Sequence, residues 1–207
     1  NVMGTKKLLK GLSKFVPKQF VFISSVSVYG VVEGESINEE SPLMADDPYG
    51  ESKIDAEEEV KKWCQKYNVV CTILRLPLIV GVNAPGNLGL MIRGIQKGYY
   101  FNIAHGRAKK SMVLATDISK FILNAAEVGG IYNLTDGYHP NFNELSHCIA
   151  KQMEKKLVHN MPMIMANFLA LVGDRLGQKS PINSNKLLKI RSSLTFDDSK
   201  AREAFGW

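Results

Sequence analysis

Hydrophobic residues follow two different periods along the first 80 residues of the chain. Over residues 4–15 and 49–67 apolar side chains recur every three or four positions, a spacing that predicts amphipathic helices, the second of them closed by Asn68. Residues 20–25 and 69–76 are instead short, continuous apolar runs, which predict fully buried parallel strands. Strand, helix and strand in this order form a βαβ unit, whose connection we expect to be a right-handed crossover.

The pattern after Pro77 predicts one further strand and several helices. The strand is expected over residues 131–135 and the helices over residues 86–98, 118–128, 141–155, 162–176 and 198–205. Asp117 is expected to cap the second of these helices, and Asn141 with Glu144 to form a capping box for the third. Residues 162–176 are apolar on most sides, so we expect this helix to be buried against another element.

The sheet predicted from these strands is incomplete. Parallel strands that are buried on both faces need neighbouring strands, and helices on each side. The chain also begins with Asn1 in the middle of a helical pattern and not with an initiator methionine. We therefore expect the later part of a larger α/β domain, whose earlier strands and helices would add on the order of ninety residues.

The composition is typical of a soluble globular protein and excludes several other classes. Of the 207 residues, 45% are hydrophobic and 22% are charged. No apolar run reaches the roughly 18 to 20 residues that a membrane span needs, and no segment is typical of a signal peptide. Three cysteines, an odd number without metal-ligand spacing, favour a reduced, cytoplasmic protein. The four histidines also lack the spacing of a metal site, so no metal is expected.

Charge is distributed unevenly along the chain, whose formal net charge is +6. Residues 33–59 contain eleven acids and one lysine, whereas residues 60–207 contain twenty basic and nine acidic residues. Ordinary solvated faces account for such an excess in many proteins, but the basic stretch also suits an anionic small molecule such as a nucleoside diphosphate. Nucleic acid is not an expected partner, because the basic residues are scattered and lack interleaved aromatic residues.

The strongest candidate for chemistry is the segment YGESK at residues 49–53. Tyr49 and Lys53 are four positions apart, so on a helix they share one face, with Cβ atoms about 5–6 Å apart. A nearby ammonium favours the phenolate form of a tyrosine and suits it to exchange a proton with an alcohol or ketone oxygen. Chance produces about 0.5 such pairs in a composition of this kind, so the pair alone is weak evidence.

Two serines strengthen this interpretation. Ser24 and Ser25 end the first predicted strand, and ligands of open α/β sheets bind beyond the carboxyl ends of the strands. The helix that starts at Tyr49 follows this strand, so we expect its first turn over the same edge. Ser25 would then donate a hydrogen bond to the oxygen that Tyr49 protonates. The alternative for Ser25 is a strand-end hydroxyl that bonds only to the backbone.

Several ordered segments resemble blocks of the extended short-chain dehydrogenase/reductase family. They are SSVSVYG at residues 24–30, PYGESK at 48–53, RLPLIVG at 75–81 and KAREAFGW at 200–207. The resemblance is to the nucleotide-sugar epimerase, dehydratase and reductase members, in the branch that builds bacterial surface polysaccharides. It implies a Rossmann-type NAD(P) domain with a smaller, mixed substrate-binding domain.

The resemblance also implies how the chain is divided. Residues 1–80 would be the second half of the Rossmann domain, and residues 81–207 mostly the substrate-binding domain, with 117–135 returning to the Rossmann core. The family's glycine-rich dinucleotide loop has no counterpart in this sequence. Because that loop holds the cofactor phosphates, we expect the 207 residues alone to be inactive.

By resemblance, Ser25 orients the sugar oxygen, Tyr49 exchanges the proton, and Lys53 contacts the nicotinamide ribose. The positions expected to contact NAD or NADP are Ser24, Tyr49, Lys53, Pro77 and Leu78. The positions expected to contact the substrate are Val26, Asn87, Leu88 and Lys110. Lys110 stands where many relatives carry arginine, so it keeps the charge but loses the bidentate fork. Leu78 stands where well-known 4-epimerases carry asparagine.

The function implied is an NAD(P)-dependent epimerase or reductase that transfers hydride at C4 of a nucleoside-diphosphate sugar, most simply a UDP-sugar. A dehydratase is less favoured, because relatives that dehydrate carry an acidic pair where Val26 and Ser27 stand. The resemblance further implies a homodimer formed through the helices at residues 4–15 and 49–67. Because no apolar run is long enough to span a membrane, no contact with a membrane is expected. The alternative is a regulatory member of the same fold that senses dinucleotide without turnover.

Overall fold

The structure is a computed structural model that describes residues 1–82, 86–155, 158–177, 180 and 182–207. Its helices are α1 (Val2–Leu12), α2 (Pro48–Tyr67), α3 (Gly86–Lys97), α4 (Ala115–Val128), α5 (Phe142–Gln152), α6 (Met163–Leu176), α7 (Ser184–Arg191) and α8 (Ser199–Phe205), with 3-10 helices η1 (Val26–Tyr29) and η2 (Ala104–Gly106). Its strands are β1 (Gln19–Ser25), β2 (Gly34–Ile37), β3 (Val70–Leu76), β4 (Leu78–Val80), β5 (Phe101–Ile103), β6 (Met112–Leu114), β7 (Gly130–Asn133), β8 (His159–Met161) and β9 (Leu194–Phe196).

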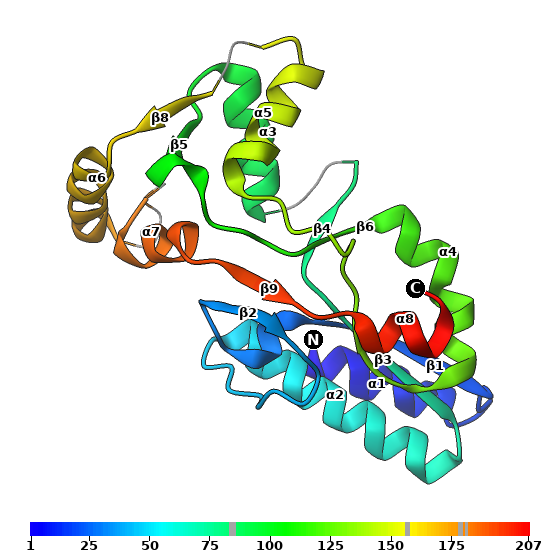
Figure 1. The fold of residues 1–207 in the computed structure, drawn as a ribbon. Helices are drawn as coiled ribbons and strands as arrows, with labels where there is room; N and C mark the ends of the chain where they lie inside the picture. Colours follow the sequence, from blue (N-terminus) through cyan, green and yellow to red (C-terminus); the bar gives the residue numbers. More distant parts are fainter. Residues whose placement is uncertain (83–85, 156–157, 178–179, 181) are drawn as a thin grey trace.

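A three-stranded parallel sheet in the order β1-β3-β7 organises the first lobe (Figure 1). The register places Ser25 opposite Leu76 and Arg75 opposite Asn133. Helices α1 and α2 pack on one face around Trp63, whereas α4 and α8 pack on the other face around Leu74. The α/β class expected from the sequence is therefore confirmed, and the carboxyl ends of all three strands lie at one edge.

Strand β1 differs from the expectation of a fully buried strand. Of its seven residues only Ser24 is buried, whereas β3 is buried from Thr72 to Leu76. The reason is its position: β3 lies between two strands, while β1 ends the three-stranded sheet. A continuous apolar run predicts a strand but not its place in the sheet.

The second lobe contains α3, α5, α6 and α7 with the parallel pair β5 and β8 (Figure 1). Leu88, Met91 and Ile95 of α3 pack against Ala150 of α5 in its core. Two more parallel pairs, β4 with β6 and β2 with β9, lie between this part and the three-stranded sheet. The strands of these three pairs were not predicted from the sequence, since runs of three or four residues carry no distinctive period. Helix α7 was also not predicted.

Local cap signals were predicted with mixed success. The capping box of Asn141 and Glu144 is present, with both reciprocal hydrogen bonds. Asn68 ends α2 in the left-handed conformation, as expected for a helix that it closes. The expectation for Asp117 was wrong: α4 begins at Ala115, so Asp117 lies inside its first turn and pairs with Lys120.

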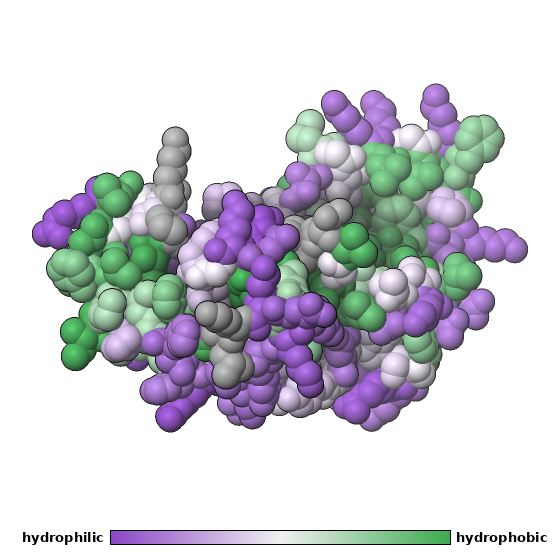
Figure 2. Space-filling model, turned by 90° about the horizontal axis from the view of Figure 1, so that it is seen from above, coloured by the Kyte–Doolittle hydropathy of each residue, from purple (hydrophilic) through white to green (hydrophobic). Residues whose placement is uncertain are grey.

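Helix α6 was expected to be buried, and this was also wrong. Its buried residues are the small ones, Ala166, Ala170 and Gly173, while most of its large apolar side chains are exposed. Figure 2 shows hydrophobic side chains gathered at the left end of the molecule, where α6 lies in Figure 1. The sequence contains the apolar residues of this helix but does not show which of its sides is covered.

Candidate active site

The site is built where β1 ends. Ser25 is the N-cap of η1: its Oγ accepts a hydrogen bond from the amide of Ser27 at 3.2 Å and donates one to the Ser27 Oγ at 3.1 Å. A serine at this position stops the strand and starts the 3-10 turn. The hydroxyl of Ser25 therefore has local partners, and its proton must turn away from Ser27 before it can be donated to a ligand.

The first turn of α2 is held over this strand end. Asp47 caps the helix by accepting hydrogen bonds from the amides of Tyr49 at 3.0 Å and Gly50 at 3.1 Å, and Pro48 takes the first helical position. A Cβ atom at Gly50 would lie 2.7 Å from the carbonyl oxygen of Ser27. Only glycine allows this close approach, which places the start of α2 directly against η1.

Lys53 links the helix to the strand. Its Nζ donates a hydrogen bond to the carbonyl oxygen of Ile23 at 2.9 Å and lies 5.9 Å from the centre of the Tyr49 ring. Burial lowers the pKa of Lys53, and the nearby carboxylate of Glu57 opposes that shift. Tyr49 is 50% exposed, so its hydroxyl is open to a ligand. The expected proximity of Tyr49 and Lys53 is thus confirmed, whereas their catalytic roles stay predictions.

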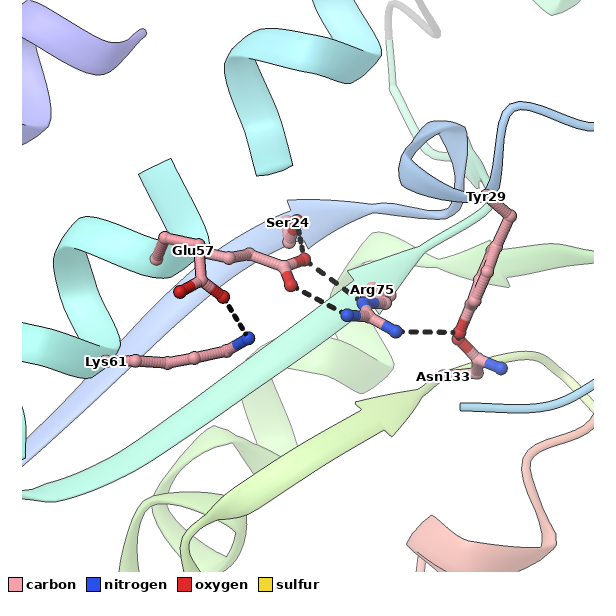
Figure 3. A network of polar contacts seen from close by, with 7 residues as sticks. Ser24, Tyr29, Glu57, Lys61, Arg75 and Asn133 are labelled. Atoms are coloured by element: carbon pink, nitrogen blue, oxygen red, sulfur yellow. Dashed lines mark hydrogen bonds and ion pairs between the residues drawn. The ribbon is translucent and has the colours of Figure 1, made fainter. Parts of the chain in front are cut away.

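A buried polar network lies one helical turn further along α2 (Figure 3). Glu57 accepts hydrogen bonds from Ser24 Oγ and from Arg75, whose Nε and Nη2 lie 3.1 and 2.8 Å from its two carboxylate oxygens. Arg75 Nη1 donates to the hydroxyl of Tyr29 at 3.1 Å, and that hydroxyl donates to Asn133 at 2.8 Å. The network joins α2, η1 and all three strands of the sheet.

Sequence reasoning assigned only one member of this network, Ser24, and gave it a different role. Ser24 was expected to contact the cofactor, but it is buried and its hydroxyl donates to Glu57. One signal was present in the sequence: Arg75 interrupts a continuous apolar strand, and a buried arginine needs a carboxylate partner. Glu57, four residues after Lys53 on the same face of the helix, is that partner.

The remaining predicted positions are spread over both lobes. Pro77, between β3 and β4, and Leu78, the first residue of β4, are half-buried, and Leu78 packs against the core of the second lobe. Val26 is half-buried beside Val28 and Tyr29. The side chain of Leu88 is buried in the second core, so only its backbone remains for a ligand. The side chain of Asn87 lies outside the described residues.

Lys110 lies at the junction between the lobes. It pairs with Leu194 in an isolated parallel bridge, and its amide donates to the carbonyl oxygen of Pro140 at 3.1 Å. Burial, and then the charge of Lys189, lower the pKa of Lys110 to about 8, while Glu33 acts in the opposite direction. A partly desolvated ammonium of this kind gains stability from an anionic ligand.

Comparison with known proteins identifies the family. The model of the family described as "NAD dependent epimerase/dehydratase family" matches residues 1–135, which is more than half of the chain. The chain belongs to this family. The resemblance seen in the segments at residues 24–30, 48–53 and 75–81, and the Rossmann-type class, are therefore confirmed.

Relatives within the NAD dependent epimerase/dehydratase family include several 4-epimerases. Over 215 residues the chain is 28% identical to N-acetyl-alpha-D-glucosaminyl-diphospho-ditrans,octacis-undecaprenol 4-epimerase of Escherichia coli O157:H7, covering 99% of this chain and 65% of that protein. Over 123 residues it is 32% identical to UDP-glucose 4-epimerase 2 of Arabidopsis thaliana, covering 56% of this chain and 35% of that protein.

Solved structures of the same family share the fold. The UDP-glucose 4-epimerase of Thermotoga maritima with UDP-glucose superposes with a TM-score of 0.71 at 21% identity, over 99% of this chain and 62% of that chain. A dTDP-glucose 4,6-dehydratase of Streptomyces venezuelae with bound NAD gives 0.72 at 18% identity, over 100% and 60%. The chain thus spans less than two thirds of these two structures and of the E. coli relative.

Three further properties of the chain concern its cysteines, metal binding and membrane-spanning segments. All three cysteines are free, and burial raises the pKa of Cys64 to about 12. The described residues bring no three histidine, cysteine, aspartate or glutamate side chains together in a way that could hold a metal ion. Within the same residues, no helix combines the length and apolarity that crossing a membrane requires.

Proposed function

We propose that the protein is an NAD(P)-dependent epimerase or reductase that acts at C4 of a nucleoside-diphosphate sugar. Membership of the NAD dependent epimerase/dehydratase family supports the reaction class. The observation that carries the assignment is the placement of Tyr49, Lys53 and the end of β1: the lysine ammonium bonds to the Ile23 carbonyl and lies 5.9 Å from the tyrosine ring.

The residues at the end of β1 fit a nicotinamide cofactor at its ribose end. An ammonium has three donors, and Lys53 directs one of them to Ile23, so it can also donate to ribose hydroxyls. When bound, the nicotinamide exchanges hydride with the substrate carbon. Pro77 and Leu78, half-buried beside the strand ends, would cover the ring and keep water from it.

Proton transfer is the part of the proposed reaction that residues of this chain carry out. The exposed hydroxyl of Tyr49 exchanges a proton with the substrate oxygen, and the charge of Lys53 favours the phenolate that results. The hydroxyl of Ser25 turns from Ser27 to donate to the same oxygen. Lys110 binds the diphosphate at the junction of the lobes, which restores favourable interactions to its partly buried ammonium.

Tyr49→Phe tests this assignment. In the intact protein, with a UDP-sugar and NAD, we expect turnover to fall about 100- to 10,000-fold because the proton donor is lost, while UDP-sugar binding is retained. Tyr67→Phe is a matched control, since Tyr67 lies at the other end of the same helix. Near-normal turnover of Tyr49→Phe would remove this residue from the mechanism. Ligand binding without any turnover by the parent protein would instead support the regulatory alternative.

A second class of substrate is favoured by one observation. The E. coli relative acts on a sugar joined through diphosphate to undecaprenol, a long hydrocarbon alcohol. Helix α6 of this chain exposes a large apolar surface, which a protein acting only on water-soluble nucleotide sugars does not need. Measuring C4 epimerisation of a UDP-sugar against the same sugar on a polyprenyl diphosphate, presented in detergent, decides between the two classes.

The domain division at residue 80 and the homodimer stay predictions. The exposed side chains of Met3 and Leu8 on α1 are available for the proposed dimer contact. Size-exclusion chromatography coupled to light scattering would show one chain per particle if that contact does not form.

A further inference from the structure

Helix α6 exposes an unusually large apolar surface. Ile164 is 84% exposed and Phe168 66%, and Leu171 is also exposed one turn later. A second exposed stripe beside it consists of Met165, Leu169, Val172 and Leu176. With 100° between successive residues, the two stripes are adjacent and form one continuous face.

The packing of α6 keeps this face outward. Ala166, Ala170 and Gly173 form the buried side and face Leu187 of α7 and its preceding loop. A Cβ atom at Gly173 would lie 1.8 Å from the carbonyl oxygen of Ile182, so this loop lies directly on the helix. Small residues therefore make the intramolecular contact, and the bulky apolar side chains are left for another surface.

The surroundings of the face are basic. Residues 161–196 contain five basic residues and one acid. The acid, Asp174, accepts hydrogen bonds from the amide and hydroxyl of Ser184 and lies on the polar side of α6. Arg175 lies within the apolar face and is exposed. An apolar face that contains Arg175, in a segment with more basic than acidic residues, complements an anionic lipid surface.

Other occupants are better accommodated elsewhere. A strand that joins the three-stranded sheet would pair with β1 or β7, and the expected dimer uses α1 and α2; all of these lie in the first lobe (Figure 1). Helix α6 lies at the far end of the second lobe. With 14 residues it is about 21 Å long, which is too short to cross a bilayer but sufficient to lie along its surface.

We propose that α6 binds in the plane of an anionic membrane surface, with Ile164, Phe168 and Leu171 inserted among the lipid chains. The guanidinium of Arg175, within the face, contacts the lipid phosphates. This proposal differs from the sequence-based expectation of no membrane contact, which considered only membrane-spanning segments. The inference shares the exposed face of α6 with the lipid-linked substrate class proposed above, but it concerns binding only, and its test needs no turnover.

Flotation of the purified protein with vesicles tests this. We expect it to float with vesicles of phosphatidylcholine and phosphatidylglycerol, more weakly at high salt, and more weakly with phosphatidylcholine alone. Replacing Ile164 and Phe168 together by serine should reduce binding at least about tenfold. Both side chains are exposed, so folding is expected to be unchanged, and circular dichroism checks this.

Two further variants sharpen the test. Arg175→Ser should reduce the preference for anionic vesicles, because the cation within the face is lost. Leu123→Ser is the matched control: Leu123 is 75% exposed, but on α4 in the first lobe, so its loss should leave binding unchanged. Failure of the parent protein to float, or equal binding by the Ile164 and Phe168 variant, would overturn the proposal. So would a dimer that this variant dissociates, since α6 would then bind a second copy.

Discussion

The ion pair of Glu57 and Arg75 leads to the sharpest stability prediction. Neither side chain has appreciable exposure, 0% for Glu57 and 2% for Arg75. Replacing Glu57 by glutamine keeps the shape of the side chain but removes its charge. The guanidinium of Arg75 then remains buried in the sheet without a counter-charge, and the Gln amide group presents donors to a group that only donates.

The expected magnitude follows from the geometry. At 2.8 Å and an effective dielectric constant of about 20, the pair attracts by about 6 kcal/mol. Because desolvation of both ions opposes this attraction, the measurable loss on breaking a buried pair is about 3–5 kcal/mol. Such a loss is a large part of the roughly 5–15 kcal/mol by which a typical domain is stable.

Urea denaturation measures this loss as a shift of the midpoint at constant slope. Glu58→Gln is the matched control, because the neighbouring Glu58 is exposed and pairs with Lys61 on the surface; its loss should be within about 1 kcal/mol. In the double variant Glu57→Gln with Arg75→Gln, we expect a smaller loss than the two single variants add up to. A Glu57→Gln protein as stable as the control would refute the reasoning.

Three further predictions concern other parts of the chain. Asp47→Ala removes the cap of two amides at the start of α2, so the free energy of unfolding should fall by about 1 kcal/mol in urea titrations. Gly173→Ala places a methyl group against the carbonyl of Ile182, and the thermal midpoint should fall as α6 separates from its loop; an unchanged midpoint contradicts that contact. Burial lowers the pKa of Lys110 to about 8 against about 10.4 in the unfolded chain. The unfolded chain then binds more protons between these values, so stability should rise with pH across that window and Lys110→Met should flatten the rise.

The parts of the fold that were predicted correctly depend on neighbours in sequence. The helix caps at Asn68 and Asn141 are formed by residues within one turn of each other, so they can be recognised from the sequence. Strands β4 and β6 are three residues each and exist because they pair with each other, over thirty residues apart. Nothing within either segment indicates that partner. The exposure of α6 was missed for a similar reason, since periodicity does not reveal which face is covered.

In the candidate site, too, only the contacts between residues close in sequence were predicted. Tyr49 and Lys53 lie on one helix, so their proximity follows from a spacing of four. The hydroxyl of Ser24 points to Glu57 and not toward a ligand. Arg75, 51 residues later in the sequence, needs the carboxylate that Ser24 also contacts. Only the three-dimensional pairing of β1 with β3 brings these groups together.

The position of β1 at the end of the three-stranded sheet has a further consequence for what can bind to it. As the end strand of the three-stranded sheet in the described chain, it presents peptide groups along its outer side. Residues 20–23, FVFI, carry no charge or proline that would discourage another extended segment from joining them. An extended segment that joins β1 would therefore hydrogen-bond to its backbone along this side and cover the apolar residues that β1 leaves partly exposed.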